Sequence, residues 1–345
     1  MTARFATADE IADWDNLLLA NPDGGEFFQT KEFADIKSAQ GWTPRFILVN
    51  NAAILALEKS VFGLGKLWYL PQGSGFTIET AQSFVDEITT FARKSGVFAL
   101  KCEPQIKRSE DADQKLQQTG FAKSTDVQPT MSTIWLDVRG ETDEIEASFG
   151  SKTRYNIRQA RKGGVVCREM PANDETYEAF YQLFTETADG RFVIRPYEYY
   201  RKFWSAYCES GHGIIMFAYD GDKLASADFV MILGEKASRK DAGSTRQKTT
   251  RGAPALLVLE TIRVLKTRGV TDYDLCGAPE SSRIKDQTHP LYGVGQFKAG
   301  FSEEVTDYAG TYLLPIRPIA AKLWLRYVEK IVRALHFRLK HQAWY

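Results

Sequence analysis

The sequence predicts an α/β (α+β) protein built from two similar domains in tandem. Its 345 residues correspond to about two domains at the usual ~150 residues each. A composition of 43% hydrophobic and 26% charged residues is typical of a globular protein and excludes disordered and fibrous chains. Both halves show the same order of predicted elements, namely two helices, a hairpin, a helix and a strand, which indicates duplication of one domain type.

In the first half, helical spacing covers 9–20 and 27–42, and an amphipathic helix over 80–95 carries Phe84, Ile88 and Phe91 on one face. Asn50-Asn51 is a plausible hairpin turn between two apolar runs. Strands are predicted at 45–50, 52–60, 66–73, 97–104, 119–124 and 130–138.

In the second half, helices are predicted at 141–163, 173–188, 197–209 and 254–268. Strands are expected at 163–170 and 271–277, and Asp220-Gly221 is a strong turn signal for a hairpin over 213–234.

Charge and motif content exclude several classes of protein. Basic and acidic side chains balance at 44 each, whereas a protein that coats long nucleic acid usually has a basic excess, so any such contact is expected to be local. No run approaches the ~18 apolar residues of a membrane span, and the first residues lack the apolar core of a signal peptide, so we expect a cytoplasmic protein. The four cysteines have no CxxC spacing and the histidines form no HExxH motif, so free thiols and no metal are expected.

Residues 317–341 contain seven basic residues and one acid, a net charge of +6. Trp324, Val328, Ile331 and Leu335 are predicted to form one apolar stripe of a helix. Two interpretations remain open. The helix packs on the protein core and exposes a solvated basic face, or residues 319–341 contact an anionic membrane as a basic amphipathic helix.

Two helical segments have cations placed for ligand binding. In 27–42, Lys31 and Lys37 flank an apolar face, so that one lysine can reach into a cleft, although a solvated lysine is the usual case. In 148–164, cations recur at helical spacing on one face and can bind phosphates or remain solvated; they are Lys152, Arg154, Arg158 and Arg161.

Residues 289–301 have the sequence HPLYGVGQFKAGF. Three glycines and a single lysine, Lys298, suggest an irregular loop whose backbone can approach a ligand closely. We therefore expect a functional role for this stretch.

FFQTKEFADIKSAQGW, SKTRYNIRQARKGG, HPLYGVGQFKAGF and YAGTYLLP occur in this order, and together they resemble the FemABX family. Members of that family are non-ribosomal peptidyltransferases that use aminoacyl-tRNA to build peptidoglycan cross-bridges. The resemblance implies two acetyltransferase-like (GNAT) domains, 1–145 completed by 311–345, and 146–310. No segment is long enough for the helical-hairpin arm of the larger family members.

The resemblance also implies roles for individual residues. Lys298 and Phe297 match the catalytic FKxGF pair, and Glu103 matches an acidic position proposed as a base. Residues matched to precursor binding are Lys37, Arg195, Tyr199 and Tyr292. The tRNA would lie on the cationic face of 148–164.

The expected reaction transfers an amino acid from aminoacyl-tRNA to the stem peptide of a lipid-linked or UDP-linked peptidoglycan precursor, with no cofactor. One alternative is an acyl-CoA-dependent N-acyltransferase of the same fold. Its pyrophosphate loop is weak here, because Thr249 stands where that loop has Arg or Gln before Gly252. A second alternative is a non-catalytic module that binds anionic ligands.

Overall fold

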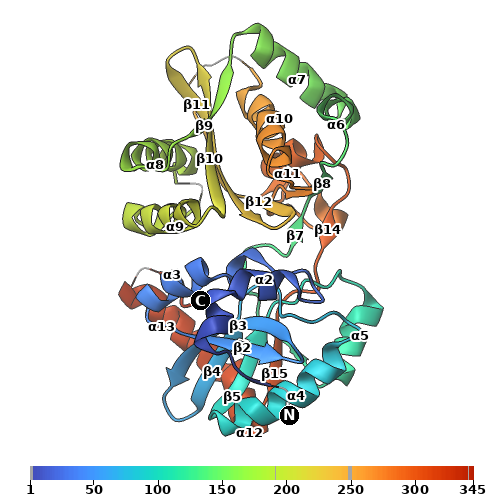
Figure 1. The fold of residues 1–345 in the computed structure, drawn as a ribbon, viewed down its shortest axis with the longest axis vertical. Coiled ribbons are helices and arrows are strands. Elements are labelled where there is room, and N and C mark those ends of the chain that lie inside the picture. Colours follow the sequence, from blue (N-terminus) through green and yellow to red (C-terminus); the bar gives the residue numbers. More distant parts are fainter. Residues whose placement is uncertain (1–2, 191, 248–250, 341) are drawn as a thin grey trace. The chain divides into compact units, whose positions relative to one another are not determined.

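The computed structural model describes residues 3–190, 192–247, 251–340 and 342–345. The chain divides into two compact units, Met1–Pro129 with Tyr308–Tyr345 and Thr130–Asp307. The division lies earlier than the expected boundary at 145, because β8 (Trp135–Asp137) pairs with β13 (Asp272–Asp274) in the second sheet. Each unit is a mixed α/β domain with a hydrophobic core of its own (Figure 1).

The first unit contains a seven-stranded sheet with the order β1-β2-β3-β4-β5-β15-β6. Its strands are β1 (Arg4–Phe5), β2 (Thr43–Val49), β3 (Ala52–Val61), β4 (Gly65–Leu70), β5 (Val97–Cys102), β6 (Ala122–Lys123) and β15 (Tyr312–Pro315). Its helices are α1 (Ala8–Ala12), α2 (Trp14–Leu19), η1 (Phe27–Gln29), α3 (Lys31–Ala39), α4 (Ala81–Lys94), α5 (Glu110–Gln118), α12 (Pro318–Leu323), η3 (Trp324–Val328) and α13 (Glu329–Lys340). Among the strands named here, β4 and β5 alone pair in parallel.

Both faces of this sheet are covered by helices. The α4 helix buries Phe84 and Ile88 in the same cluster as Leu100 of β5, while Trp324 of η3 contacts Phe98 of β5, ring centroids 5.8 Å apart. The predicted turn at Asn50-Asn51 is confirmed, since both residues have positive φ (51° and 71°) and join β2 to β3.

The second unit contains a six-stranded sheet with the order β8-β13-β12-β11-β10-β9 and a short β7–β14 pair. Its strands are β7 (Ser132–Thr133), β8, β9 (Val166–Met170), β10 (Gly213–Asp220), β11 (Lys223–Leu233), β12 (Lys236–Ser244), β13 and β14 (Thr306–Asp307). Its helices are α6 (Thr142–Ser148), α7 (Ser151–Lys162), α8 (Asp174–Ala188), α9 (Tyr197–Glu209), α10 (Ala253–Lys266), η2 (Ser281–Arg283) and α11 (Tyr292–Ala299).

The two sheets share one topology. In each, an antiparallel series ends in a single parallel pair, β4–β5 and β12–β13, and an antiparallel strand follows, β15 and β8. In the second unit α8 and α9 cover one face of the sheet and α10 the other, and α7 packs against α10 (Figure 1). The predicted duplication therefore agrees with the strand order.

Several elements differ from their predicted form. The sequence analysis missed α5 and β12, whose polar residues hide the helical and strand periodicity. The single helix expected over 141–163 is two helices, because the chain turns at Phe149 and Gly150. There the Gly150 amide donates to the Gly300 carbonyl at 2.9 Å.

The irregular loop expected at 289–301 is wrong, because most of it forms the α11 helix. Its glycines provide room for packing. A Cβ at Gly295 would lie 2.5 Å from Pro279, and one at Gly300 would lie 2.2 Å from the Thr153 hydroxyl of α7. The glycines thus let α11 lie close to its neighbours, which fixes the position of Lys298.

The expected apolar stripe of the terminal helix is also wrong, because a π turn, η3, interrupts it. Trp324 and Glu329 both point inward although they are five residues apart, an arrangement that a turn wider than an α turn permits. Ile331 and Leu335 of the expected stripe are consequently exposed.

Candidate functional site

The parallel pairing of β12 and β13 ends at Ser238 and Asp274, and the chain then continues from β13 through Cys276. Cys276 has φ of +61°, a left-handed conformation that is uncommon for residues other than glycine. Its amide donates a 2.7 Å hydrogen bond to Asp274 Oδ1, and its thiol lies 2.9 Å from the Ser238 hydroxyl. These contacts hold a tight turn at the end of β13.

Lys298 of α11 points to this turn. Its ammonium donates to the carbonyl oxygens of Cys276 and Gly277, at 2.9 and 2.7 Å, and the residue is only 7% exposed. Burial lowers the pKa of Lys298 to about 8, and the charge of Arg239 acts in the same direction while Asp274 opposes it. At pH 7 the amine is therefore mostly cationic, held inside the protein and not in bulk solvent.

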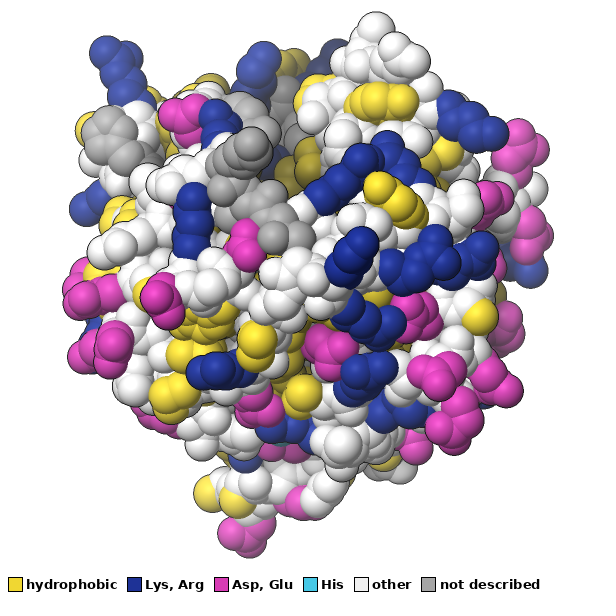
Figure 2. All heavy atoms as spheres, turned by 90° about the horizontal axis from the view of Figure 1, so that it is seen from above, with side chains coloured by type: hydrophobic (Ala, Val, Ile, Leu, Met, Phe, Trp, Pro, Cys, Tyr) yellow, Lys and Arg dark blue, Asp and Glu magenta, His cyan; other side chains and the backbone are white. Residues whose placement is uncertain are grey.

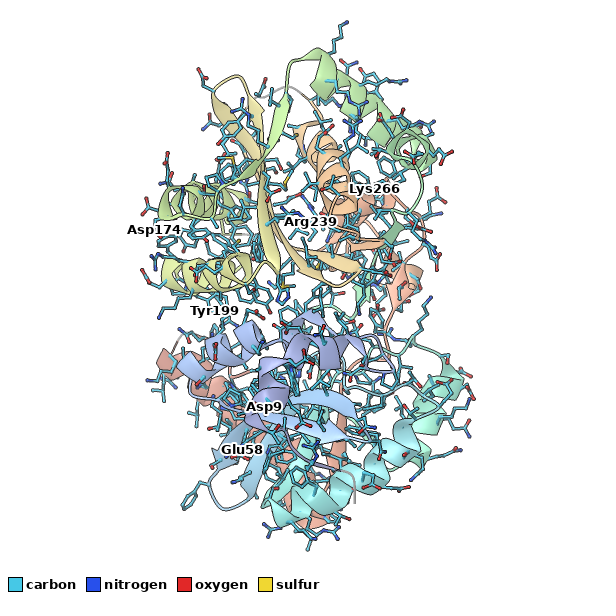
Figure 3. The ribbon with its side chains drawn as sticks, viewed as in Figure 1. Asp9, Glu58, Asp174, Tyr199, Arg239 and Lys266 are labelled. Carbon is cyan, nitrogen blue, oxygen red and sulfur yellow. The ribbon has the colours of Figure 1, made fainter. Side chains whose placement is uncertain are left out.

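Phe297 precedes Lys298 and lies over a buried ion pair. Its ring is 5.6 Å from the Arg239 guanidinium, which donates two hydrogen bonds to the Asp228 carboxylate, at 2.7 and 2.5 Å. Asp228 has no exposed surface, and Figure 3 shows Arg239 in the interior of the second unit, unlike Asp174 at its outer side. The ion pair therefore supports α11 through the ring of Phe297.

Arg195 and Tyr199 contact each other at the start of α9, with the guanidinium 4.4 Å from the centre of the tyrosine ring. Arg195 precedes the helix, so the pair is formed across its first turn. Burial raises the pKa of Tyr199, and the positive charges of Arg195 and Lys240 oppose this. The side chain thus lies in a cationic environment.

Lys240 is a further site residue that the sequence analysis missed. It falls where the register of β12 against β11 shifts, between the pairs Val230–Arg239 and Phe229–Asp241. Such a β-bulge redirects a side chain. Its ammonium forms an ion pair with Asp241 at 3.2 Å, and its charge acts to lower the pKa of both the Tyr199 hydroxyl and the Cys276 thiol, so Lys240 lies near the Arg195–Tyr199 pair and near the turn that holds Lys298. The sequence signal for Lys240 is weak, because it lies in the charged run Arg239-Lys240-Asp241 of a polar segment.

The cations of α7 divide into two kinds. Arg154 donates to the Ala147 and Phe149 carbonyls at the end of α6, and Arg161 forms an ion pair with Glu146 at 2.8 Å. Lys152 and Arg158 are exposed, and within the described part of the chain neither side chain has a hydrogen bond or an ion pair. Figure 2 looks onto the end of the second unit that carries α7 and shows Lys and Arg side chains gathered over part of it.

Tyr292 opens α11 and is half-buried, with its amide bonded to the His289 carbonyl at 2.9 Å. It shares the α11 helix with Lys298.

Two candidate residues belong to the first unit. Lys37 of α3 is only 4% exposed, and its ammonium lies 5.2 Å from the Phe33 ring and 3.3 Å from Gln40 Oε1. It is therefore not the solvated lysine that the sequence pattern alone favours. Lys31, the other lysine of this helix, donates to the Ala12 carbonyl at the surface.

Glu103 directly follows β5, at the end of the parallel β4–β5 pair, a position in the topology like that of the Cys276 turn in the second unit. It has no exposed surface, and the Tyr69 hydroxyl donates to its Oε2 at 2.5 Å. Burial raises the pKa of the Glu103 carboxyl. Its Oε1 has no hydrogen-bond partner among the described residues.

The FemAB family model matches residues 12–223 and 216–330. The chain belongs to the FemAB family. The resemblance inferred from the motifs is thereby confirmed, and members of this family are transferases of peptidoglycan synthesis. No curated protein matches the sequence at a significant level.

Among solved structures, the FemAB chain is similar to FemX, with a TM-score of 0.78, 17% identity, and 94% of this chain and 99% of that chain covered. It is also similar to the C-terminal domain of a putative lysylphosphatidylglycerol synthetase from Agrobacterium fabrum, with a TM-score of 0.53, 13% identity, and 96% and 98% covered. A third similar structure is L-PGS from Bacillus licheniformis, with a TM-score of 0.54 and 13% identity, and with 94% of this chain and 97% of that chain covered. These likenesses show that the chain has the fold of FemX over nearly its whole length, as the resemblance implied.

The start of α10 is where the acyl-CoA alternative would bind pyrophosphate, and it is closely packed in the FemAB chain. Gly252 caps this helix with φ of +100°, and a Cβ there would lie 2.0 Å from the Asn156 carbonyl oxygen of α7. The α7 backbone thus occupies one side of the helix start, where a pyrophosphate would bind. Thr249, on which the sequence argument depends, lies outside the described residues.

No group of three or more His, Cys, Asp or Glu side chains in the described ranges could hold a metal ion. Among the same residues, no helix has both the length and the hydrophobicity to cross a bilayer.

Proposed function

We propose that this FemAB protein transfers an amino acid from aminoacyl-tRNA to an amine of the stem peptide of a peptidoglycan precursor. The acceptor nitrogen attacks the ester carbonyl, a C–N bond forms, and the C–O bond to the tRNA ribose breaks. The proton lost by the amine passes to the ribose oxygen, so the reaction balances with aminoacyl-tRNA as co-substrate and no cofactor. The buried cation of Lys298, in a chain of this family, is the observation that carries the proposal.

Lys298 is the proposed donor to the oxyanion that develops on the ester carbonyl. Its amine is held by two carbonyl oxygens, so it needs little reorganisation to turn one N–H toward a substrate. Loss of one such donor typically costs about 3 to 4 kcal/mol of transition-state stabilisation. Phe297, beside it, provides an apolar surface for the tRNA terminus.

The remaining candidates are proposed to hold the two substrates. Lys37, Arg195, Tyr199 and Tyr292 bind the precursor, whose phosphates and carboxylates suit cations and phenols. Lys152 and Arg158 contact the tRNA backbone. Arg154 and Arg161 contribute less, because carbonyl oxygens and Glu146 already occupy them.

Glu103 is proposed as a base only for a lysine acceptor. Deprotonating an α-amine of pKa near 8 at pH 7 costs about 1 kcal/mol, whereas a lysine amine near 10.4 costs about 4.6 kcal/mol. The raised pKa of the Glu103 carboxyl makes it a stronger base than an ordinary glutamate, but a substrate can reach it only if the surrounding residues open.

The test combines the purified protein with charged tRNAs and with either a UDP-linked or a lipid-linked precursor, and measures the new amide. We expect transfer to one of the two acceptors and a loss of at least about 100-fold in Lys298→Ala. Lys266→Ala is the matched control, because its amine also donates to backbone carbonyls, those of Val138, Arg139 and Gly140. No transfer to either acceptor, together with acyl transfer from acetyl-CoA, would establish the alternative enzyme class.

A further inference from the structure

The α12–η3–α13 segment has an apolar face that points away from its own domain. Ile319, Leu323, Tyr327, Ile331 and Leu335 recur every four residues, and all are exposed, Ile319 by 80%. In a regular α-helix this spacing drifts by about 40° per step, but the wider π turn at Trp324–Val328 takes back part of the drift. The five side chains therefore form a row, here called the outer row.

The rotation of this segment is fixed by its inner face. Trp324 is fully buried, and the Glu329 carboxylate accepts hydrogen bonds from the buried Lys101 ammonium and, at 2.7 Å, from the Tyr345 hydroxyl. Turning the outer row inward would expose Trp324 and separate a buried ion pair, which is strongly unfavourable. The outer row therefore remains exposed in the folded domain.

Cations flank the outer row. Lys322, Arg326 and Lys330 are all exposed and also recur every four residues, each one position before a member of the row. Adjacent positions of a helix lie about 100° apart, so the three cations follow one side of the apolar row. A long apolar row bordered by cations is the pattern of helices that lie in the interface of an anionic membrane.

A second apolar projection lies beside the start of this segment. Phe62 in the turn between β3 and β4 is fully exposed. A groove of about 490 Å³ separates this turn from α12, and its lining includes Gly63, Leu64, Arg93, Arg317, Ile319 and Leu323. Arg317 donates to the Leu64 carbonyl at 3.3 Å, which keeps its guanidinium at the groove. Two arginines between apolar side chains suit lipid phosphates at the level of the headgroups.

We propose that the outer row, its flanking cations and Phe62 bind the surface of a bilayer that contains anionic lipid. The apolar side chains enter the acyl boundary, and the cations with Arg93 and Arg317 contact headgroup phosphates. The proposed function supplies only the reason for such binding, because a lipid-linked acceptor requires the enzyme at a membrane. Its test measures binding and not transfer.

The experiment measures binding of the full chain to vesicles of phosphatidylcholine, with and without phosphatidylglycerol. We expect binding only with phosphatidylglycerol and weakening by salt. Lys322→Gln/Arg326→Gln/Lys330→Gln should bind roughly 100-fold more weakly, at about fivefold per charge. Phe62→Ser/Ile319→Ser should lose roughly tenfold or more, and neither set should change the melting temperature, because all five side chains are exposed.

Control variants remove exposed side chains of the same two kinds elsewhere. Val193→Ser removes an apolar side chain that is 84% exposed in the second unit, and Lys107→Gln/Lys202→Gln/Lys285→Gln removes three exposed cations. Both should bind as the wild type does. The proposal is wrong if the wild type binds vesicles equally well with and without phosphatidylglycerol, or if the control variants bind as weakly as the test variants. It is also wrong if Ile319→Ser dissociates a dimer of this chain that forms without vesicles.

Discussion

The Lys298 ammonium donates a 2.9 Å hydrogen bond to the carbonyl oxygen of Cys276, a residue held at φ of +61°. The two residues are far apart in sequence, and they meet because α11 lies across the end of β13. The contact combines a buried cation with a strained turn, a combination found at functional sites. Because the Cys276 carbonyl accepts a hydrogen bond from the Lys298 amine, the pH dependence of the proposed reaction is tied to the backbone conformation of Cys276.

The rate of transfer should depend on the protonation of Lys298. The protein lowers the pKa of this amine to about 8, so its cation is present below pH 8 and is lost as the pH rises further. The acceptor amine titrates as well, and the ratio of wild-type to Lys298→Met single-turnover rates cancels that effect. This ratio should be constant below pH 7 and fall about tenfold per pH unit above 8. A ratio that stays constant to pH 10 would contradict a role for the cation.

The Cys276 turn should tolerate glycine better than a β-branched residue. Glycine adopts positive φ without cost, whereas valine at φ of +61° would add about 1 to 3 kcal/mol of strain. We expect Cys276→Gly to unfold in urea within about 1 kcal/mol of the wild type and Cys276→Val to be clearly less stable and less active. Cys208→Val, within the α9 helix, is the control and should cost less than about 1 kcal/mol. Equal stability of the two Cys276 variants would show that the turn carries no strain.

Asp228→Asn should destabilise the second unit strongly. The carboxylate is fully buried and neutralises Arg239, and removal of one partner of such a pair costs about 3 to 5 kcal/mol. Glu146→Gln, which breaks the more exposed pair with Arg161, should cost no more than about 1 kcal/mol. Urea denaturation, monitored by tryptophan fluorescence, gives the free energy of unfolding of each variant. Similar losses in the two variants would refute the role assigned to burial.

Lys152→Gln/Arg158→Gln should weaken aminoacyl-tRNA binding through charge alone. Each phosphate contact contributes about 0.7 to 0.9 to the slope of log K against log salt, so the double variant should lower that slope by about 1.5. Arg161→Gln should change it less, because Glu146 already holds its guanidinium. The slope is obtained from the binding constant measured at a series of salt concentrations. An unchanged slope in the double variant would remove α7 from the tRNA site.

Part of this fold could be read from local sequence patterns. The hairpin turns at Asn50-Asn51 and Asp220-Gly221 and the helices α8 and α9 occur as predicted, because their signals come from residues a few positions apart. The α11 helix was missed, because its glycines resemble a loop and serve instead to bring the helix close to Pro279 and Thr153. The π turn of the terminal segment was missed for a related reason: its register follows from packing of Trp324 and Glu329 against β5.

By itself the sequence determined the α/β class, the duplicated plan and the ordered motifs that indicate the FemAB family. Only the tertiary structure decided which of the charged residues are exposed and which are held by the protein. Arg154 and Arg158 are equivalent in helical spacing, yet one binds carbonyl oxygens and the other is exposed. The charge and the pKa of a side chain depend on neighbours that are distant in sequence, as Cys276 and Arg239 are for Lys298, and no local pattern records them.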